Sequence, residues 1–287
     1  MGRFSMRIRA IPLRTPYWIP GIDYITAVLK PIQQLVQEGD IVTVSEKSLS
    51  VAQGLIIDES KVKPSLLAKF LSRVWMRRVW GGPLGKVTGL RKRTLMHLRS
   101  YPLLEGAAHK QVALSYVGFL QALRHYSEGG IDASNLPYSY VSLPLRDASA
   151  VADRLRRVIE EKTGKKVVVM IVDGDATYSF RNLYLAPRRL KVRGLIHLGG
   201  FLTFVLGRVF RLKGRATPIA ISGAELHPDY ALTLADMAHR SRGRGAGRTV
   251  WSMARRFNVG VTEVTWEMLE SVVHRPIVLL RVDREDK

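Results

Sequence analysis

Three aspartates lie where their surroundings allow them to do chemistry. Asp132 sits in "GGIDASN" (129–135), a segment with almost no helix-forming content, behind two glycines and ahead of a Ser-Asn pair. Asp173 and Asp175 follow directly after the β-branched run "VVVMIV" at Val167–Val172. If the fold brings the three together, their oxygens could hold one or two magnesium or manganese ions, the hard cations that carboxylates prefer.

A turn or a helix cap is the alternative role for each aspartate taken alone, because Asp hydrogen-bonds its own backbone in such positions. Like-charged carboxylates that lie close together are costly without a cation. Convergence of the three side chains would therefore itself indicate a metal site.

Other chemistries are excluded by what the sequence lacks. Cysteine is absent, which removes disulfides, thiolate nucleophiles and cysteine metal sites. The seven histidines form no H-x-x-x-H pair and lie outside any nucleophile elbow, and no segment has the order of a P-loop. Carboxylate oxygens are thus the expected ligands of any metal ion.

The formal net charge is +21 over 287 residues, and the pI is near 10.6. This excess is far larger than solubility requires and favours a strongly anionic partner, either a nucleotide, a nucleic acid or an acidic metabolite. The abundant arginine suits phosphate and carboxylate groups. A general basic bias of the proteome, or adaptation to heat, would explain the same charge without such a partner.

Composition also predicts a folded soluble protein, with 46% hydrophobic residues and a mean hydropathy near zero. No charged, apolar, small-residue leader precedes Met6, which could itself start the folded part, so we expect a cytoplasmic location. The longest apolar stretch, Gly194–Phe210, is shorter than the roughly 20 residues of a membrane span. It is interpreted as a core strand or helix, and no membrane partner is expected.

Apolar periodicity predicts a mixed α/β (α+β) fold with more than one sheet and with helices packed on the faces. Strands are expected at 6–13, after the turn at 38–40, at 167–172 and at 275–282. Helices are expected at 22–36 with a kink at Pro31, at 65–80, from Asp147 to Gly164, and at 227–240. Asp173 and Asp175 would then end a central strand, the edge where ligands gather in open α/β sheets.

Two basic segments are interpreted as loops. Gly81–Lys110 is expected to be an exposed connection or a nucleic-acid contact, and Arg240–Arg248 a glycine loop that either wraps phosphates or is disordered. Two α/β parts are expected, 1–128 with the basic helix and loop and 129–287 with most of the metal site, or a single interlocked domain.

The stretch "GIDASN" (Gly130–Asn135), followed by "SLPL", the helix "RLRRVIEEKTGKK" and the strand "VVVMIVD", resembles the coenzyme F-420 gamma-glutamyl ligase family. The N-terminal "MRIRAIPL" and "GDIVTVSEKSLSVAQG" resemble its first strand and its serine-lysine-containing loop. Enzymes of this family add L-glutamate to a deazaflavin coenzyme precursor at the expense of GTP. The resemblance therefore implies a GTP-dependent ligase, magnesium or manganese, and a homodimer.

Site residues follow from the same resemblance. It implies that Asp132 and Asp173 bind the ions, with Asp175 and Thr177 as competitors for part of the second role, and that Asn135 contacts the nucleotide. Further nucleotide contacts are implied for Thr15, Pro16, Tyr17 and Trp18, and for Ser45, Glu46 and Lys47.

The chain departs from the family pattern at three places, one of which is the segment after Asp175, where the usual Gly-Arg pattern is missing. Val51 stands in "SVAQG" where the family usually has a nucleotide-contacting lysine, and the arginine-glycine run 240–248 replaces the C-terminal nucleotide loop. A paralogue with an altered substrate is consistent with these changes.

Three hypotheses follow from the sequence. The first is a GTP- or ATP-dependent amide ligase in which a substrate carboxylate forms an acyl phosphate that an amino-acid amine displaces. The second is an RNA-binding protein on the same scaffold that uses the basic region 73–99 and Arg240–Arg248. The third is a non-catalytic paralogue.

Overall fold

The structure, a computed structural model, describes residues 6–284 and contains two sheets within them. The larger sheet has seven strands in the order β1-β9-β2-β5-β6-β7, with β8 paired to β5. These strands are β1 (Met6–Thr15), β2 (Ile41–Ser45), β5 (Val168–Phe180), β6 (Leu183–Ala186), β7 (Ile196–His197), β8 (Lys213–Ser222) and β9 (His274–Arg284). The smaller sheet pairs β3 (Ile56–Asp58) with β4 (Tyr140–Ser142).

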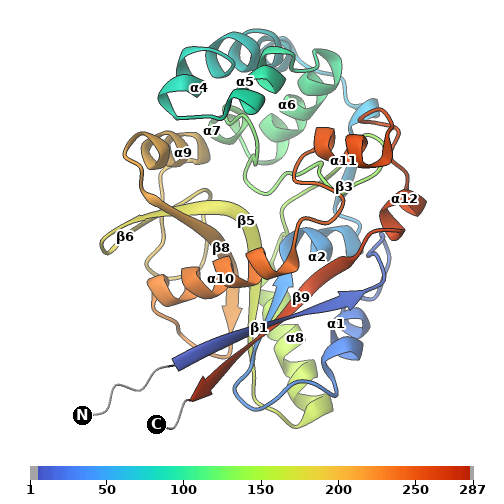
Figure 1. Cartoon of the computed structure of the whole chain (residues 1–287), viewed down its shortest axis with the longest axis vertical. Helices are drawn as coiled ribbons and strands as arrows, with labels where there is room; N and C mark the ends of the chain where they lie inside the picture. Colours follow the sequence, from blue (N-terminus) through green and yellow to red (C-terminus); the bar gives the residue numbers. More distant parts are fainter. Residues whose placement is uncertain (1–5, 285–287) are drawn as a thin grey trace.

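Helices cover both faces of the large sheet, which confirms the predicted fold class (Figure 1). β5 alternates between the two faces. Val169 and Ile171 pack in the core with α1 (Tyr24–Ile32) and α8 (Ala148–Thr163), whereas Met170 and Val172 pack against α10 (Pro228–Arg242). Because both faces are covered here, the first part of the strand, Val168–Val172, is apolar at every position, as a strand buried on both faces requires.

α8 confirms the prediction for the segment after Asp147. The Asp147 carboxylate accepts from the backbone N–H of Ala150, and Gly164 ends the helix in the left-handed region, at φ +66°. Leu155 and Ile159 bury one stripe of the helix in the core. The helices at 22–36 and 227–240 are also confirmed as α1 and α10, with shifted bounds.

A group of short helices stands above one end of the sheet (Figure 1). It comprises η1 (Glu59–Lys61), α3 (Leu66–Phe70), the π-helix η2 (Leu71–Trp80), α4 (Pro83–Val87), α5 (Lys92–Arg99), α6 (Leu104–Tyr116), α7 (Phe119–Ala122) and α9 (Gly200–Val209). The remaining helices are α2 (Glu46–Ala52), α11 (Val250–Phe257) and α12 (Trp266–Glu270). The interpretation of 81–110 as a loop is therefore wrong, since most of it is helical.

The predicted stripe on the helix 65–80 is confirmed only in part, because Leu71 is buried and Trp75 packs in the same core cluster while the first residues of the stripe are exposed. Leu66 and Phe70 are 84% and 52% exposed, while Met76 and Trp80 are fully buried. The helix becomes π-wound from Leu71, which changes the angular spacing that a 3.6-residue period assumes.

The stretch Gly194–Phe210 is helical in its second half, yet it is not a core element along its length. Phe201, Phe204 and Val205 pack against the buried Trp80, whereas Phe210 is 67% exposed. None of the helices formed by residues 6–284 has both the length and the apolar character of a membrane span.

The predicted end of the central strand at Asp173 is also wrong. β5 continues to Phe180, and its pairing with β8 shifts register between Asp173 and Ala176. The aspartates lie at this irregularity inside the strand, beyond the point where its parallel neighbour β2 ends opposite Val172. The division at residue 128 stays a prediction, although the large sheet combines strands from both sides of it.

The Asp147 cap gives a first testable prediction. Asp147→Ala should lower the free energy of unfolding by about 1 kcal/mol, because the N–H of Ala150 loses its acceptor. Asp147→Asn should have a much smaller effect, since an amide oxygen can also cap. Urea unfolding of both variants measures the difference, and equal losses would show that the charge rather than the cap matters.

Candidate active site

The candidate site begins at the carboxyl end of β2, near the centre of the sheet. β2 ends at Ser45, and Glu46 and Lys47 open α2, so the segment predicted as a nucleotide loop is a strand end and a helix turn. Glu46 is buried, whereas a quarter of the Lys47 side chain is exposed. The two side chains bind different partners, and this turn therefore connects two polar clusters.

Lys47 forms the first cluster with the "DAS" segment of the "GIDASN" motif. Its Nζ pairs with the Asp132 carboxylate and donates to the carbonyl and hydroxyl oxygens of Ser134, each at 2.9 Å. Asp132 Oδ1 also accepts from the backbone N–H of Ser134 at 2.7 Å, and the Asp132 main chain pairs with Ser142 of β4. Asp132 is thus both a turn residue and the partner of a cation distant in sequence.

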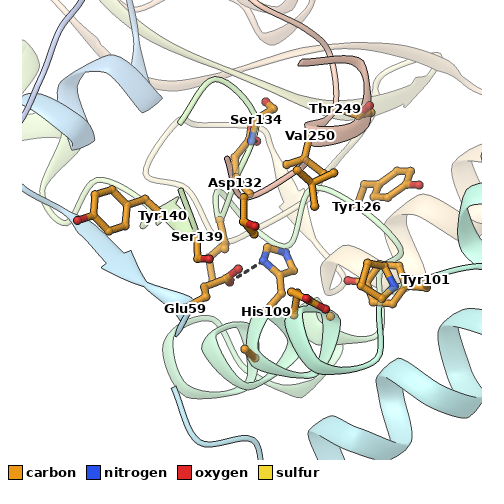
Figure 2. A pocket seen from close by; sticks show the side chains of 18 of the residues that line it. Glu59, Tyr101, His109, Tyr126, Asp132, Ser134, Ser139, Tyr140, Thr249 and Val250 are labelled. Atoms are coloured by element: carbon orange, nitrogen blue, oxygen red, sulfur yellow. Dashed lines mark hydrogen bonds and ion pairs between the residues drawn. The ribbon is translucent and has the colours of Figure 1, made fainter. Parts of the chain in front are cut away.

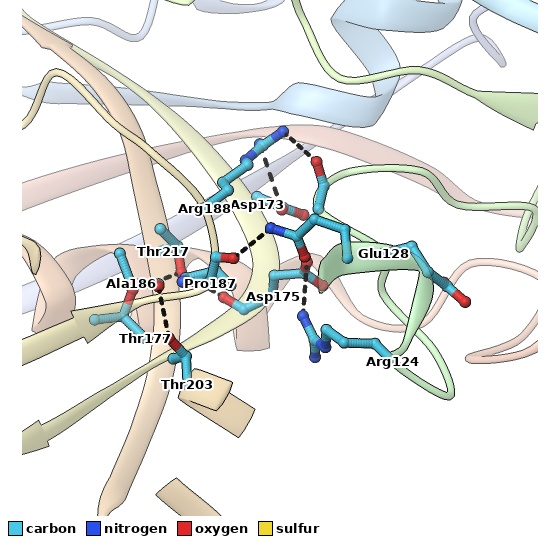
Figure 3. Close-up of polar contacts among 12 residues, drawn as sticks. Arg124, Glu128, Asp173, Asp175, Thr177, Ala186, Pro187, Arg188, Thr203 and Thr217 are labelled. Atoms are coloured by element: carbon cyan, nitrogen blue, oxygen red, sulfur yellow. Dashed lines mark hydrogen bonds and ion pairs between the residues drawn. The ribbon is translucent and has the colours of Figure 1, made fainter. Parts of the chain in front are cut away.

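Arg188 forms the second cluster. Its guanidinium pairs with Glu46 and lies 3.5 Å from Asp173 Oδ2 (Figure 3). Nη1 also donates to the carbonyl of Gly129 at 3.0 Å. Burial raises the pKa of the Glu46 carboxyl; Arg188 lowers it and the Asp173 carboxylate raises it further. The cluster thus brings two carboxylates onto one cation.

The backbone conformation and surroundings of residue 130 explain why a glycine precedes the "ID" of the motif. The Gly130 backbone has φ +99°, and a Cβ at this position would lie 2.2 Å from Arg188 Nη1. The glycine therefore allows both the turn and the close approach of the guanidinium.

Asp175 is a buried carboxyl whose charged form is disfavoured. Burial and the repulsion of Asp173 raise its pKa to about 8, although the guanidinium of Arg124 lies 3.4 Å away. Thr177, predicted as a possible metal ligand, is fully buried, and its hydroxyl bonds to that of Thr217 at 2.8 Å (Figure 3).

The three aspartates are divided between these cations. Asp132 pairs with Lys47, Asp173 with Arg188, and Asp175 with Arg124. Within residues 6–284, no group of three or more His, Asp or Glu side chains is arranged to hold a metal ion. The metal role of these residues and of Thr177 accordingly stays a prediction.

The predicted nucleotide segment 15–18 lies beside the first cluster. The Tyr17 hydroxyl donates to the carbonyl of Asn135 at 2.6 Å, and the Tyr17 ring packs on that of His274, with centroids 4.6 Å apart. Trp18 is only 2% exposed and belongs to the core.

His274, which sequence analysis missed, orders the chain around Thr15 and Pro16. Its Nδ1 lies 3.2 Å from the Thr15 hydroxyl and 3.0 Å from the Pro16 carbonyl, and Nε2 lies 3.4 Å from the Ser48 hydroxyl. Burial lowers the pKa of His274 to about 4, although the Pro16 carbonyl acts in the opposite direction. The ring is therefore neutral at pH 7. Its only sequence signal is its place at the start of a strand.

Asn135 connects the basic glycine loop 240–248 to the site through hydrogen bonds. Its Oδ1 accepts from the backbone N–H of Ala246 at 2.6 Å, and its Nδ2 donates to the carbonyl of Gly247 at 2.9 Å. Arg242 at the end of α10 lies beside His239, and burial lowers its pKa to about 10 despite the nearby Asp173 carboxylate. Val51, the departure from the family pattern, is buried in α2.

A cavity of about 670 Å³ opens between α6, the segment around 125–140 and the start of α11. Asp132 and Ser134 line one part of it, and the rings of Tyr101 and Tyr126 line another (Figure 2). The ring of Trp251, which also lines the cavity, lies 5.7 Å from that of Tyr126. A volume of this size accommodates a small organic molecule. Nothing in the sequence indicated the cavity, because its walls come from segments far apart along the chain.

A buried acid–base cluster forms part of the cavity wall. His109 Nδ1 lies 2.7 Å from Glu59 (Figure 2), and its Nε2 lies 3.4 Å from Glu128. Lys110 Nζ lies 2.5 Å from both Glu128 and the carbonyl of Arg124. Burial disfavours the charged imidazole of His109, but the two carboxylates outweigh this and raise its pKa to about 10. His109 is therefore an imidazolium at neutral pH.

The cluster predicts a pH dependence of stability. Because the folded-state pKa of His109 exceeds the unfolded value of about 6.5, its charge stabilises the fold fully below that pH, and the stabilisation disappears as the pH rises to about 10. The difference in unfolding free energy between wild type and His109→Gln should therefore shrink by at least about 1 kcal/mol across this range.

His97→Gln is the matched control. Burial lowers the pKa of His97, so its effect on stability should not change above pH 6.5. Denaturant unfolding at several pH values measures both differences. A constant difference for His109→Gln would contradict the charged state assigned to the cluster.

Comparison with known proteins defines the class that this fold and site belong to. The sequence model of the family described as F420-0:Gamma-glutamyl ligase matches residues 12–194, more than half of the chain, so the protein belongs to that family. The predicted resemblance is confirmed. The matched range contains Asp132, Asn135, Asp173 and Asp175, whereas the loop 240–248 lies outside it.

Individual relatives show how much of the chain is similar to proteins of this family. The chain is 33% identical to an uncharacterized protein of Methanocaldococcus jannaschii over 98% of both chains. It is 29% identical to a coenzyme F420:L-glutamate ligase of Archaeoglobus fulgidus, over 58% of this chain and 60% of that one. A ligase of the same name from Methanopyrus kandleri is 25% identical over 60% and 61% of the two chains. The similarity to the two ligases is thus limited to about three fifths of their length.

Proposed function

We propose that the protein is a divalent-metal- and GTP-dependent ligase that forms an amide bond through an acyl phosphate. Its family supports a gamma-glutamyl-ligase-like function. The observation that carries the proposal is the turn at Glu46 and Lys47, which joins two clusters of charged side chains. Asp132 of the first cluster also lines a cavity large enough for a substrate.

Asp173 and Asp175 fit a divalent cation. Both are carboxylates, the donors that hard ions prefer, and the pKa of Asp175 is raised to about 8 because burial and Asp173 disfavour a second negative charge. A cation would relieve this repulsion. Asp132 is the third proposed ligand, whereas the buried hydroxyl of Thr177 is bonded within the sheet and contributes least to the fit. When bound, the ion would neutralise phosphate charge.

The reaction proceeds in two balanced steps. A carboxylate oxygen of the acceptor attacks the γ-phosphorus of GTP, the bond to the β-phosphate oxygen breaks, and GDP leaves. The amine nitrogen of L-glutamate then attacks the acyl carbon, the carbon–oxygen bond to phosphate breaks, and the nitrogen loses a proton to solvent. Lys47, held by Ser134, would orient anionic groups during both steps.

Nucleotide contacts belong to the same proposal. Tyr17, Asn135 and the backbone of Ala246 lie together at the first cluster, so they can form one wall of a nucleotide site. Val51 would leave such a site without the lysine that the family usually has there. A homodimer and a cytoplasmic location, as the sequence predicted, complete the proposal.

Calorimetry with GTP and manganese tests it. Wild-type protein should bind both. Asp132→Ala should lose metal binding, and Asp173→Asn should weaken it by about 100-fold, because each removes a charged ligand of the ion. Glutamate-dependent release of GDP should fall in parallel.

Glu161→Gln is a matched control, because it removes an exposed carboxylate of α8 that belongs to neither charged cluster, and it should change neither binding nor turnover. Wild-type protein that binds neither GTP nor manganese would rule the ligase out. Manganese binding that is unchanged in both aspartate variants would show that the ion is held by other residues.

A further inference from the structure

The excess positive charge is concentrated in two parts of the chain. Residues 60–104 and 176–224 contain no Asp or Glu, yet they hold 11 and nine of the Lys and Arg residues, respectively. Since the whole chain has a net charge of +21, these two segments account for nearly all of it. The remainder of the protein is close to neutral.

The same segments expose most of the large apolar side chains. Of the 21 such side chains exposed among residues 6–284, 14 lie in these two segments. Three corners combine both features. Val87 (67% exposed) follows Lys86 at the end of α4, Phe210 (67%) precedes Arg211 after α9, and Phe180 (55%) precedes Arg181 in the turn between β5 and β6.

The three corners are neighbours. Arg208 near the end of α9 donates to the carbonyls of Thr88 and Gly89 at 3.0 and 2.8 Å, which holds the Phe210 corner beside that of Val87. Lys213, which opens β8 after Phe210, pairs with Ser179 beside the β5–β6 turn. Figure 1 accordingly shows α4, α9 and β6 along the same side of the molecule.

We propose that this side, the α4–α9–β6 face, docks on an anionic lipid surface. Basic residues around projecting apolar side chains match a bilayer interface, where the cations meet acidic headgroups and the apolar tips enter the acyl boundary. No spanning helix is involved, and the inference is independent of the ligase chemistry.

Two other partners fit the face less well. Aliphatic side chains such as Val87, Leu183 and Val209 gain nothing from phosphates, and the Phe180 ring is partly covered by the guanidinium of Arg181, 5.4 Å from its centroid, so base stacking is disfavoured. A second copy of the chain would bring two strongly basic faces together, and their repulsion opposes such an interface.

Flotation with lipid vesicles tests the proposal on the full chain. Wild-type protein should float with phosphatidylcholine vesicles that contain about one third phosphatidylglycerol, remain free with phosphatidylcholine alone, and dissociate as salt rises. Phe210→Ser should weaken binding about tenfold through the lost apolar insertion. Arg211→Ala should weaken it about fivefold through the lost charge.

Leu35→Ser and Arg157→Ala are the matched controls, because both residues are exposed but lie outside the two acid-free segments. Circular dichroism establishes that all variants are folded. Equal losses in the controls, or no flotation of wild type, would overturn the proposal. The proposal would also be overturned if the protein did not bind vesicles but bound a single-stranded RNA, and if this RNA binding were unchanged in Phe210→Ser. A dimer that Phe210→Ser converts to a monomer would overturn it as well.

Discussion

The pairing of buried carboxylates with arginines at the junction of β2 and β5 is the constraint on which the rest of the structure depends. Unpaired carboxylates at such depth would cost several kcal/mol each, because burial removes their hydration. Arg188 pairs with Glu46 and Asp173, and Arg124 pairs with Asp175. Since the two arginines come from separate segments, satisfying the charge also fixes where those segments lie.

The network continues from the sheet into the group of helices above it. The carbonyl of Arg124 accepts from Lys110 of α6, Lys110 pairs with Glu128, and His109 lies between Glu128 and Glu59. A single run of buried polar contacts thus links β5 to the wall of the cavity. The cavity and the charged clusters are held in register by the same interactions, which favours the view that they form one site.

Local patterns in the sequence were sufficient to predict the elements whose partners are simple. The helix from Asp147 to Gly164 and the strand from Val167 follow from a cap, an apolar stripe and a β-branched run. The continuation of β5 through Asp173 was not predictable, because its polar residues pair with β8 across a register shift that no period reveals. The arginines and His274 were missed for a similar reason, since their partners are set by tertiary pairing alone.

The distribution of charge changes what the basic composition means. The net charge of +21 first suggested an anionic substrate, but the site itself is nearly balanced, with each of its carboxylates paired with Lys47, Arg188, Arg124, Lys110 or His109. The surplus lies instead on segments without acidic residues. Composition therefore reports on the outer surface, and the chemistry of the site has to be read from the pairing of its side chains.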